Sequence, residues 1–346
     1  MITGQTVAVF GAYGHTGRFV VTELRDRGFT PLLLGRDAEK LQALAASHQG
    51  LEHRVASVDD PASLDAALKD ADAVINCAGP FASTGGPVIE AALRAGIPYL
   101  DVAAEIEANL DTFTHYADRA SDAGVAVVPA MAFFGGLGDL LVTTAMGDWT
   151  TADEAHVAYG LSSWHPTAGT LASGTVSRDR RDGRRVRYTG GRLEYYLDES
   201  DLPALNWDFP AGPRTVLGGF TMADVVTVPS HLSIPEVRTY MTTDAARDLA
   251  TADAPPTAVD ERGRSAQTFT VDVVVRSGDT RRRVVASGQD IYAVSAPLVV
   301  EALHRVLDGR CRTTGVASAG AIFDAPDFLR ALSAYVTVEQ LPESAA

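Results

Sequence analysis

The first part of the chain alternates between short apolar runs and segments in which apolar residues recur at helical spacing. The run at residues 6–10 ends at a glycine, and the segment from Gly14 to Arg27 would bury Phe19 and Leu24 on one face. This alternation predicts six strands with helices between them. The strands are expected at residues 6–10, 31–34, 54–58, 73–76, 99–102 and 125–128. The helices are expected at residues 14–27, 37–47, 61–69, 85–95 and 105–123.

Strands that alternate with helices are typical of a doubly wound parallel sheet, the Rossmann arrangement. Later in the chain, apolar and polar residues alternate with a period of two, which indicates a mixed or antiparallel sheet. This second pattern occurs at residues 155–161, 237–241, 268–275 and 283–288, before an amphipathic helix at 294–307. The predicted fold class is therefore α/β, in three parts. They are a Rossmann dinucleotide-binding domain at 1–131, an α+β substrate domain at 132–320 and a C-terminal helical segment at 321–346 that packs back on the first domain.

The loop after the first predicted strand reads Gly11-Ala12-Tyr13-Gly14-His15-Thr16-Gly17. In such a strand–loop–helix unit, the first glycine permits a tight turn and the second lets the backbone approach a pyrophosphate. The third glycine lets the helix pack against the sheet, and the N–H groups at the helix start face the anion. The spacing G-x-x-G-x-x-G is a variant of the commoner G-x-G-x-x-G. Its place after the first strand of a Rossmann pattern favours a dinucleotide cofactor.

The end of the second predicted strand bears on the choice between NAD and NADP. An NAD site usually has a carboxylate there for the ribose 2′-hydroxyl, whereas this chain has Gly35-Arg36-Asp37. The Arg36 guanidinium suits a 2′-phosphate and favours NADP; the alternatives are a surface arginine, or an Asp37 that turns inward to bind NAD. Asp59 is expected near the adenine and the loop 76–81 near the nicotinamide ribose, with Cys77 as a buried filler rather than a nucleophile. The predicted cofactor-binding residues are Gly11, Tyr13, Gly14, His15, Thr16, Gly17, Arg36, Asp59, Cys77, Ala78, Gly79 and Pro80.

Composition excludes several classes of function. The net charge of −15 argues against nucleic acid and anionic membrane as partners, because both attract basic surfaces. The two cysteines, Cys77 and Cys311, stand in no metal-ligand spacing, so no metal site is predicted. No apolar run is long enough to cross a bilayer, and no basic region precedes an apolar stretch near residue 1, so a cytoplasmic location is expected.

Three segments together resemble the saccharopine dehydrogenase-like NAD(P)-dependent oxidoreductases, a group that includes trans-acting enoyl reductases. They are residues 9–17, residues 74–88 with the string Asn-Cys-Ala-Gly-Pro-Phe followed by Gly-Gly-Pro-Val, and residues 96–101. The resemblance implies hydride transfer to or from C=N or C=C bonds. The chain departs from the family at Ala104-Glu105, where a Gly-Glu pair is common, and at residues 132–139. Because nicotinamide and substrate should meet there, the resemblance does not identify the substrate.

A proton donor is expected from the start of the second domain. His165, which follows a predicted strand, is the first candidate and Tyr159 the second. Tyr292, His231 and Arg178 are weaker candidates, and solvent is the alternative to any side chain. The chain has no Tyr-x-x-x-Lys pair after the fifth predicted strand, which disfavours short-chain dehydrogenase chemistry.

Seven arginines cluster around Asp182-Gly183, a dipeptide typical of hairpin turns. They predict either a solvated charged hairpin or an arm that contacts an acidic partner, such as a substrate carboxylate or an acyl carrier protein. The cluster comprises Arg178, Arg180, Arg181, Arg184, Arg185, Arg187 and Arg192.

Together these features predict an NADP(H)-dependent reductase that acts on a C=N or activated C=C bond of a small biosynthetic intermediate. The substrate is either free or bound to a carrier protein, and a homodimer is one assembly that the chain could form. Two alternatives remain open. One is a non-redox isomerase or epimerase that keeps its nicotinamide tightly bound, and the other is a non-catalytic NADP-sensing protein.

Overall fold

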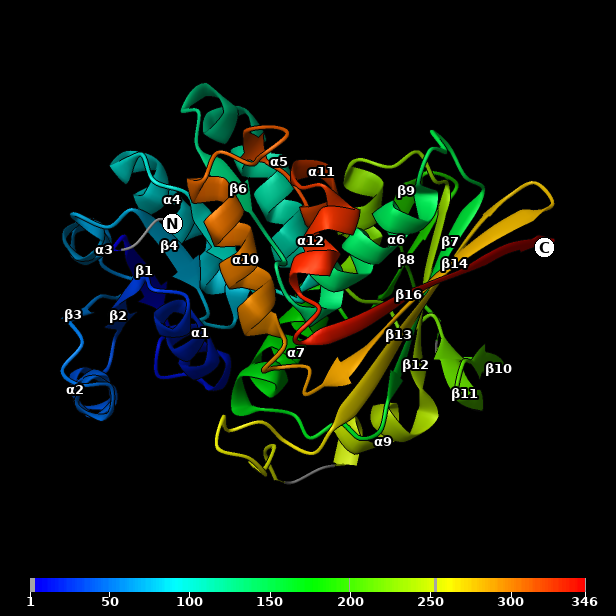
Figure 1. Ribbon diagram of the computed structural model, residues 1–346, viewed down its shortest axis with the longest axis horizontal. Helices are drawn as coiled ribbons and strands as arrows, with labels where there is room; N and C mark the ends of the chain where they lie inside the picture. Colours follow the sequence, from blue (N-terminus) through cyan, green and yellow to red (C-terminus); the bar gives the residue numbers. More distant parts are fainter. Residues whose placement is uncertain (1–3, 199, 252–253, 346) are drawn as a thin grey trace.

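Two β-sheets stand side by side in the molecule, with helices between and around them (Figure 1). The structure is a computed structural model and describes residues 4–198, 200–251 and 254–345. Residues 1–3 and 346, at the ends of the predicted domains, lie outside these ranges. Within the described residues, the first sheet has seven parallel strands in the order β15-β6-β5-β4-β1-β2-β3. They are β1 (Thr6–Phe10), β2 (Thr30–Gly35), β3 (His53–Val55), β4 (Ala73–Asn76), β5 (Tyr99–Asp101), β6 (Ala126–Val128) and β15 (Gly315–Val316).

Helices cover both faces of this sheet, because successive side chains of a strand point to opposite sides. In β1, Val7 and Val9 join a core cluster with residues of α1 and α2, whereas Ala8 and Phe10 join a cluster with residues of α3 and α4. The helices are α1 (His15–Asp26), α2 (Ala38–Ser47), α3 (Pro61–Leu68), α4 (Phe81–Ala95) and α5 (Ile106–Asp122). The predicted doubly wound sheet is confirmed.

The seventh strand, β15, comes from the far end of the chain. Gly315 and Val316 pair with Ala126 and Val127 of β6 and lie against α5. Two residues are too few to show any periodicity, so the sequence pattern could not predict this strand. The chain therefore returns from the second sheet to extend the first.

The second sheet runs in the order β10-β11-β12-β7-β13-β14-β16, with the hairpin β8–β9 attached to β12. It is mixed, as predicted, because β12 and β7 are parallel while their other neighbours are antiparallel. Its strands are β7 (Glu154–Leu161), β8 (Arg185–Thr189), β9 (Arg192–Tyr196), β10 (Ala204–Phe209), β11 (Gly212–Gly218), β12 (Glu236–Thr242), β13 (Thr268–Ser277), β14 (Thr280–Gln289) and β16 (Val336–Ala345).

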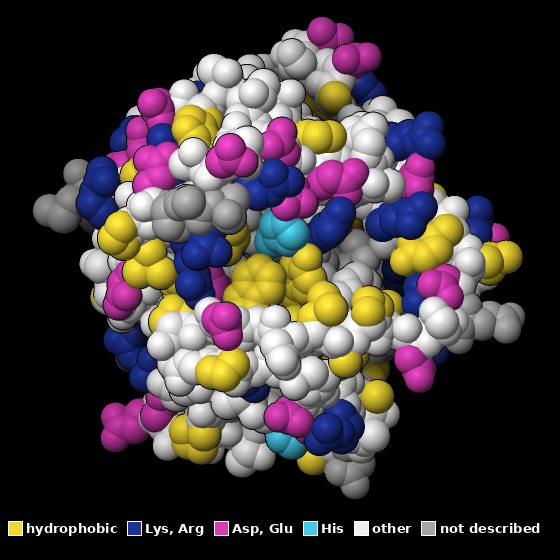
Figure 2. Space-filling view, turned by 90° about the vertical axis from the view of Figure 1, so that its right-hand side faces the viewer, with side chains coloured by type: hydrophobic (Ala, Val, Ile, Leu, Met, Phe, Trp, Pro, Cys, Tyr) yellow, Lys and Arg dark blue, Asp and Glu magenta, His cyan; other side chains and the backbone are white. Residues whose placement is uncertain are grey.

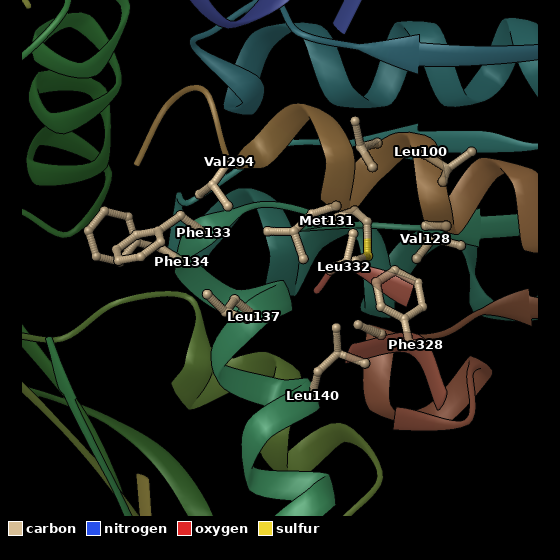
Figure 3. Packing of buried hydrophobic residues seen from close by; sticks show 14 of the residues in the cluster. Leu100, Val128, Met131, Phe133, Phe134, Leu137, Leu140, Val294, Phe328 and Leu332 are labelled. Carbon is tan, nitrogen blue, oxygen red and sulfur yellow. The ribbon is translucent and has the colours of Figure 1, made fainter. Parts of the chain in front are cut away.

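The core between the sheets is built around η1 and α6. Leu137 and Leu140 pack in one apolar cluster with Phe133, with Val294 beside α10 and with Phe328 of α12 (Figure 3). The elements of this part are η1 (Phe133–Leu137), α6 (Gly138–Met146), α7 (Ala168–Arg180), α8 (Asp224–Thr227), η2 (Val228–Ser230), α9 (Thr243–Thr251), α10 (Ser295–Leu307), α11 (Ala319–Ile322) and α12 (Ala325–Ala331).

Helix α10 binds the two halves of the chain together. It lies beside α1, although the two are far apart in sequence (Figure 1). Glu301 of α10 is buried and accepts hydrogen bonds from Arg27, at 2.6 Å, and from Arg305, at 2.7 Å. Removing one member of a buried ion pair is far more costly than breaking a surface pair. This network therefore fixes the second domain against the first helix of the Rossmann sheet.

The opposite face of the second sheet is covered in part by the hairpin β10–β11. Phe209 and Val216 of this hairpin pack on Ala158 and Tyr240 of the sheet. Figure 2 views the molecule from the side of β10, β11 and the C-terminus, and shows acidic and basic side chains intermixed around a group of hydrophobic ones. None of the helices in the described ranges combines the length and apolar composition needed to span a membrane.

Two predictions of local structure are wrong. The segment 321–346 is only partly helical: α12 packs on α6, but Val336–Ala345 forms β16, which pairs with β14 in the second sheet. Its alternation of Val336 and Val338 with polar residues is the strand signal that the prediction missed. Asp182-Gly183 ends α7, with both residues at positive φ, and the hairpin β8–β9 turns instead at Gly190-Gly191. The domain boundaries at 131 and 320 stay predictions.

A buried carboxylate lies behind the kinked segment η1. Asp224 is fully buried, and the buried hydroxyl of Tyr159 donates its one proton to this carboxylate, at 2.8 and 2.9 Å from the two oxygens. Burial raises the pKa of the Asp224 carboxyl to about 6. Because the ordinary value of 3.8 applies to the unfolded chain, the folded protein holds more protons between the two values.

We predict that Asp224→Asn flattens the pH dependence of stability. The raised pKa stabilises the fold at low pH, and this contribution is lost as pH rises through about 6. The wild type should therefore lose about 1 kcal/mol relative to the variant between pH 5 and pH 7. Urea unfolding at both pH values measures the difference. Parallel curves for the two proteins would show that Asp224 does not titrate in this range.

Candidate functional site

A cavity of about 1470 Å³ opens where the strands of the first sheet end and the second domain begins. It exceeds the roughly 300–1000 Å³ typical of a site for one small ligand, so it has room for a cofactor and a substrate together. All predicted cofactor-binding residues except Gly17 line it. They come from the β1–α1 loop, the end of β2, the loop after β3 and the loop after β4, at the carboxyl edge where Rossmann sheets bind ligands.

The glycine loop lies directly against the loop after β4. Gly11 has φ +82°, and a Cβ at this position would be 2.8 Å from the backbone nitrogen of Ala78. The Gly11 N–H donates to the carbonyl of Leu34, at 2.9 Å, and the Gly14 N–H donates to the carbonyl of Gly11, also at 2.9 Å. Only glycine tolerates both this φ angle and the close contact with Ala78, so the two loops can pack directly against each other beside the cavity.

Gly17 has a packing role rather than a contact with the cavity. A Cβ there would be 2.3 Å from the carbonyl oxygen of Gly11. The close packing places the first turn of α1 behind the loop, and the N-cap residue Gly14 supplies no side-chain cap. The N–H groups of His15, Thr16 and Gly17 in that turn have no acceptor within the helix. They can therefore bind the pyrophosphate of a dinucleotide.

The side chain of His15 also indicates a ligand site. Its Nε2 atom is buried and has no hydrogen-bond partner among the described residues, although the side chain lines the cavity. The ring stands edge-on between Phe19 and Tyr292, at centroid distances of 5.3 and 5.2 Å. Burial lowers the pKa of His15, while Asp290 acts in the opposite direction. Buried polar atoms are rarely left unpaired, so this atom fits a site that a ligand completes.

The end of β2 favours NADP over NAD. The Arg36 side chain lines the cavity and has no hydrogen bond or ion pair in the described part of the chain. Asp37 is engaged elsewhere: it caps α2 by accepting from the Lys40 N–H, at 3.1 Å, and pairs with the Lys40 ammonium. These contacts hold the pKa of Asp37 below its ordinary value. The carboxylate that could bind a ribose 2′-hydroxyl is therefore the helix cap, and the unpaired guanidinium faces the cavity.

The loop after β4 is held from behind by buried polar groups. Asn76 accepts from the Ala78 N–H, at 3.0 Å, and donates to Thr84 and to the Tyr99 hydroxyl, each at 3.2 Å. Burial raises the pKa of the Cys77 thiol, so this residue remains an uncharged filler, as its sequence context predicts.

Glu105, which follows the departure from the family pattern at Ala104, has a structural role. Its carboxylate accepts from the Phe81 N–H, at 2.7 Å, and from the Ala82 N–H, at 3.0 Å. Both donors belong to the first turn of α4, where a carboxylate is favourable. This external cap explains why α4 begins at Phe81, earlier than the helical pattern predicts.

Comparison with known families agrees with this geometry. Residues 7–128 match the family model described as "Saccharopine dehydrogenase NADP binding domain". The first domain is therefore similar to this family. The match confirms both the resemblance inferred from the sequence motifs and the predicted cofactor, NADP.

Relatives match about a third of the chain, and one solved structure matches nearly all of it. The human "Saccharopine dehydrogenase-like oxidoreductase" is 32% identical over 145 residues, which cover 37% of this chain and 34% of the relative. The "Trans-acting enoyl reductase" of Mycobacterium bovis is 27% identical over 133 residues, 37% of this chain and 32% of the relative. The matched regions thus span about a third of these relatives. The apo saccharopine dehydrogenase (L-Glu forming) of Saccharomyces cerevisiae shares the whole fold, with a TM-score of 0.67, 14% identity and coverage of 98% of this chain and 100% of that one.

The structure places neither predicted proton donor in the cavity. Tyr159 is fully buried behind Phe133 and Phe134, and its hydroxyl is used by Asp224. His165 is exposed outside the lining, because the chain turns there to enter α7. Alternate side chains of β7, Tyr159 among them, point into the core. The local sequence alone does not show which face of this strand is directed toward the cavity.

The cavity wall on this side is formed by other residues. The Tyr292 hydroxyl accepts from the Trp164 indole N–H, at 3.2 Å, and from the Thr167 N–H, at 3.3 Å, and lies 3.0 Å from the Thr170 hydroxyl. The sequence pointed to Tyr292 only as a weaker proton-donor candidate and gave no sign of these contacts. His231 instead pairs with the buried Asp139, at 2.7 Å, away from the cavity.

Most of the clustered arginines are paired. Arg180 contacts Asp111, at 2.8 Å, and Arg181 contacts Glu107, at 3.2 Å, so both connect α7 to α5. The remaining pairs are Arg184 with Asp182, Arg185 with Asp198, and Arg187 and Arg192 with Glu194. Arg178 differs, because its side chain has no hydrogen bond or ion pair in the described part of the chain. For the paired members, the structure agrees with the charged-surface interpretation.

We predict that Arg36→Gln weakens NADPH binding by roughly 10- to 100-fold, because a charge-assisted contact to the 2′-phosphate is lost. The affinity for NADH should change by less than about twofold. Calorimetric titration of both cofactors measures the two constants. The control is Arg25→Gln, since Arg25 is an exposed residue of α1 and contacts His48 rather than the cavity. Equal losses for NADPH and NADH would contradict the assignment of Arg36 to the 2′-phosphate.

A second prediction concerns the glycine loop. Gly11 and Gly50 have similar φ angles, +82° and +78°, but a Cβ at Gly50 would meet nothing within 4 Å. Gly50→Ala should cost about 1–2 kcal/mol of stability from the left-handed backbone alone and leave NADP⁺ affinity unchanged. Gly11→Ala should cost more and weaken NADP⁺ binding at least tenfold. Thermal unfolding and titration compare the two variants, and equal effects would mean that the Ala78 contact is unimportant.

Proposed function

We propose that the protein is an NADP(H)-dependent oxidoreductase that reduces a C=N or activated C=C bond of a small biosynthetic intermediate. The observation that carries this proposal is the single cavity that holds the glycine loop and Arg36 at one end and α7 of the second domain at the other. The names of the relatives support it, since they include an oxidoreductase and an enoyl reductase.

When bound, NADPH would supply a hydride to the electrophilic carbon. The residues of this chain bind and orient the reactants. The first turn of α1 holds the pyrophosphate, Arg36 the 2′-phosphate and the loop at Gly79-Pro80 the nicotinamide side of the cofactor. A Cβ at Gly79 would be 2.9 Å from the Ser173 hydroxyl, so α7 lies directly across this loop. The substrate would then sit between the loop and α7.

The same wall would present apolar surface to one side of the reacting atoms. Phe133, Phe134 and Trp164 contribute apolar surface to the lining, and the Phe134 and Trp164 rings lie 5.3 Å apart. Tyr292 positions α7 through Thr167 and Thr170 and is already engaged by two N–H donors. We therefore assign it to positioning, and assign the proton that completes the reduction to solvent.

The test is NADPH consumption by the full chain with two panels of compounds, cyclic imines and α,β-unsaturated carbonyl compounds. We expect the absorbance of NADPH to fall with at least one panel, in step with formation of the saturated product. We also expect the Arg36→Gln variant to need a higher NADPH concentration for half-maximal rate. Cofactor that copurifies with the chain and is never consumed, while a substrate is isomerised, would contradict the proposal.

A further inference from the structure

Almost every arginine side chain in the described part of the chain has a hydrogen bond or an ion pair, and the exceptions line one cavity. The chain has 44 Asp and Glu against 29 Lys and Arg, so an acidic partner is available to most guanidinium groups. Within the described residues, only Arg36 and Arg178 have side chains with no hydrogen bond, ion pair or ring contact. Both line the cavity.

The two unpaired arginines belong to different parts of the cavity. Arg36 follows β2 at the adenine end, whereas Arg178 lies in the last turn of α7, on the side of the second domain. A helix C-terminus favours a positive charge but supplies no carboxylate to pair with it. The Arg36 guanidinium would bind the 2′-phosphate of NADP, whereas the Arg178 guanidinium has no role in binding this cofactor.

The position of Arg178 relative to the cofactor suits a small substrate. Ser173 of α7 approaches Gly79, in the loop that holds the nicotinamide side. Arg178 is five residues further along the helix, or about 7.5 Å at the rise of an α-helix. The ion pairs of Arg180 and Arg181 with α5 fix this end of α7 over the cavity. The guanidinium can therefore reach a group a few bonds away from a carbon placed at the nicotinamide.

The charges around Arg178 also favour an anion. Arg181, Arg184 and Arg185 line the same region, but each of them is paired with an acid, Glu107, Asp182 and Asp198 respectively. The acidic side chains in the lining are Asp59, near the adenine end, and Glu105, whose carboxylate is occupied by the first turn of α4. No carboxylate of the described lining is thus free to pair with Arg178. A planar guanidinium left open in a cavity is suited to carboxylate or phosphate oxygens, which it binds through two parallel hydrogen bonds.

We propose that Arg178 binds an anionic group of the substrate, a carboxylate or a phosphate, inside the cavity that also holds NADP. The inference rests on the proposed function and names the class of its substrate. Arg178 is a specificity-determining residue: it holds the anionic end while the reducible bond lies at the loop of Gly79. Neutral analogues of the same size would lack this contact and would bind weakly.

The experiment is calorimetric titration of the full chain, saturated with NADP⁺, using succinate, inorganic phosphate and the uncharged succinamide as probes. The wild type should bind one of the two anions and not succinamide; which anion binds separates a carboxylate from a phosphate substrate. Arg178→Gln should weaken this binding roughly tenfold or more, and Arg178→Lys should restore part of it. The affinity for NADP⁺ should be the same in all these proteins.

The matched control is Arg192→Gln, because Arg192 belongs to the same cluster but is paired with Glu194 and lies outside the lining. It should bind the anion as the wild type does. Equal anion affinity in wild type and Arg178→Gln would overturn the proposal, and so would a wild type that binds neither anion. If NADP⁺ itself does not bind, the proposed function fails separately, and the same titrations without NADP⁺ still test Arg178.

Discussion

The whole site depends on the close contact between two loops of the first sheet. Gly11 turns with a left-handed backbone directly against Ala78, so no side chain can stand between the glycine loop and the loop after β4. This contact holds the two loops together beside the cavity, and the first turn of α1 begins next to them. The unfilled N–H groups of that turn, the unpaired Nε2 of His15 and the unpaired Arg36 then face one space. Each of these groups alone is weak evidence for a ligand, but together at one cavity they are typical of a dinucleotide site.

The second domain converts this binding surface into an enclosed cavity. The chain crosses between the sheets repeatedly: β15 extends the first sheet, α10 packs on α1, and the Tyr335 hydroxyl donates to Glu23 of α1, at 2.9 Å. Helix α7 buries little of its own surface and is held over the cavity by Tyr292 at its start and by ion pairs with α5 at its end. Because these contacts link both domains, the distance between cofactor and substrate is set by the fold rather than by one flexible segment.

The sequence predicted the first domain well because its signals are local. Alternating strands and helices, the three glycines and the Arg36 position each follow from a few consecutive residues, and all but one of the predicted cofactor-binding residues line the cavity. The exception, Gly17, has the packing role that its spacing indicates. The second sheet was recognisable from its period of two.

The residues of the second domain that line the cavity could not be predicted in the same way. Tyr159 and His165 were chosen for their chemistry and their place after a strand, but whether a side chain faces a cavity depends on which elements pack on that strand. Ser173 and Arg178 belong to α7, and only the folded chain brings them together with the distant Tyr292. Arg178 stood in a run of arginines, and the run itself does not show which guanidinium lacks an acid. Likewise β15 is too short, and the role of Glu105 too distant in sequence, for any local pattern to reveal them.

The central claim is that one cavity holds NADP with its 2′-phosphate at Arg36 and its nicotinamide facing α7. A crystal structure of the full chain grown with NADP⁺ tests this most directly. The account predicts density for the 2′-phosphate within hydrogen-bond distance of Arg36 and for the pyrophosphate over the N–H groups of residues 15–17. It predicts the nicotinamide between the loop of Gly79 and Ser173. A cofactor bound with its 2′-phosphate away from Arg36, or with its nicotinamide turned out of the cavity, would contradict it.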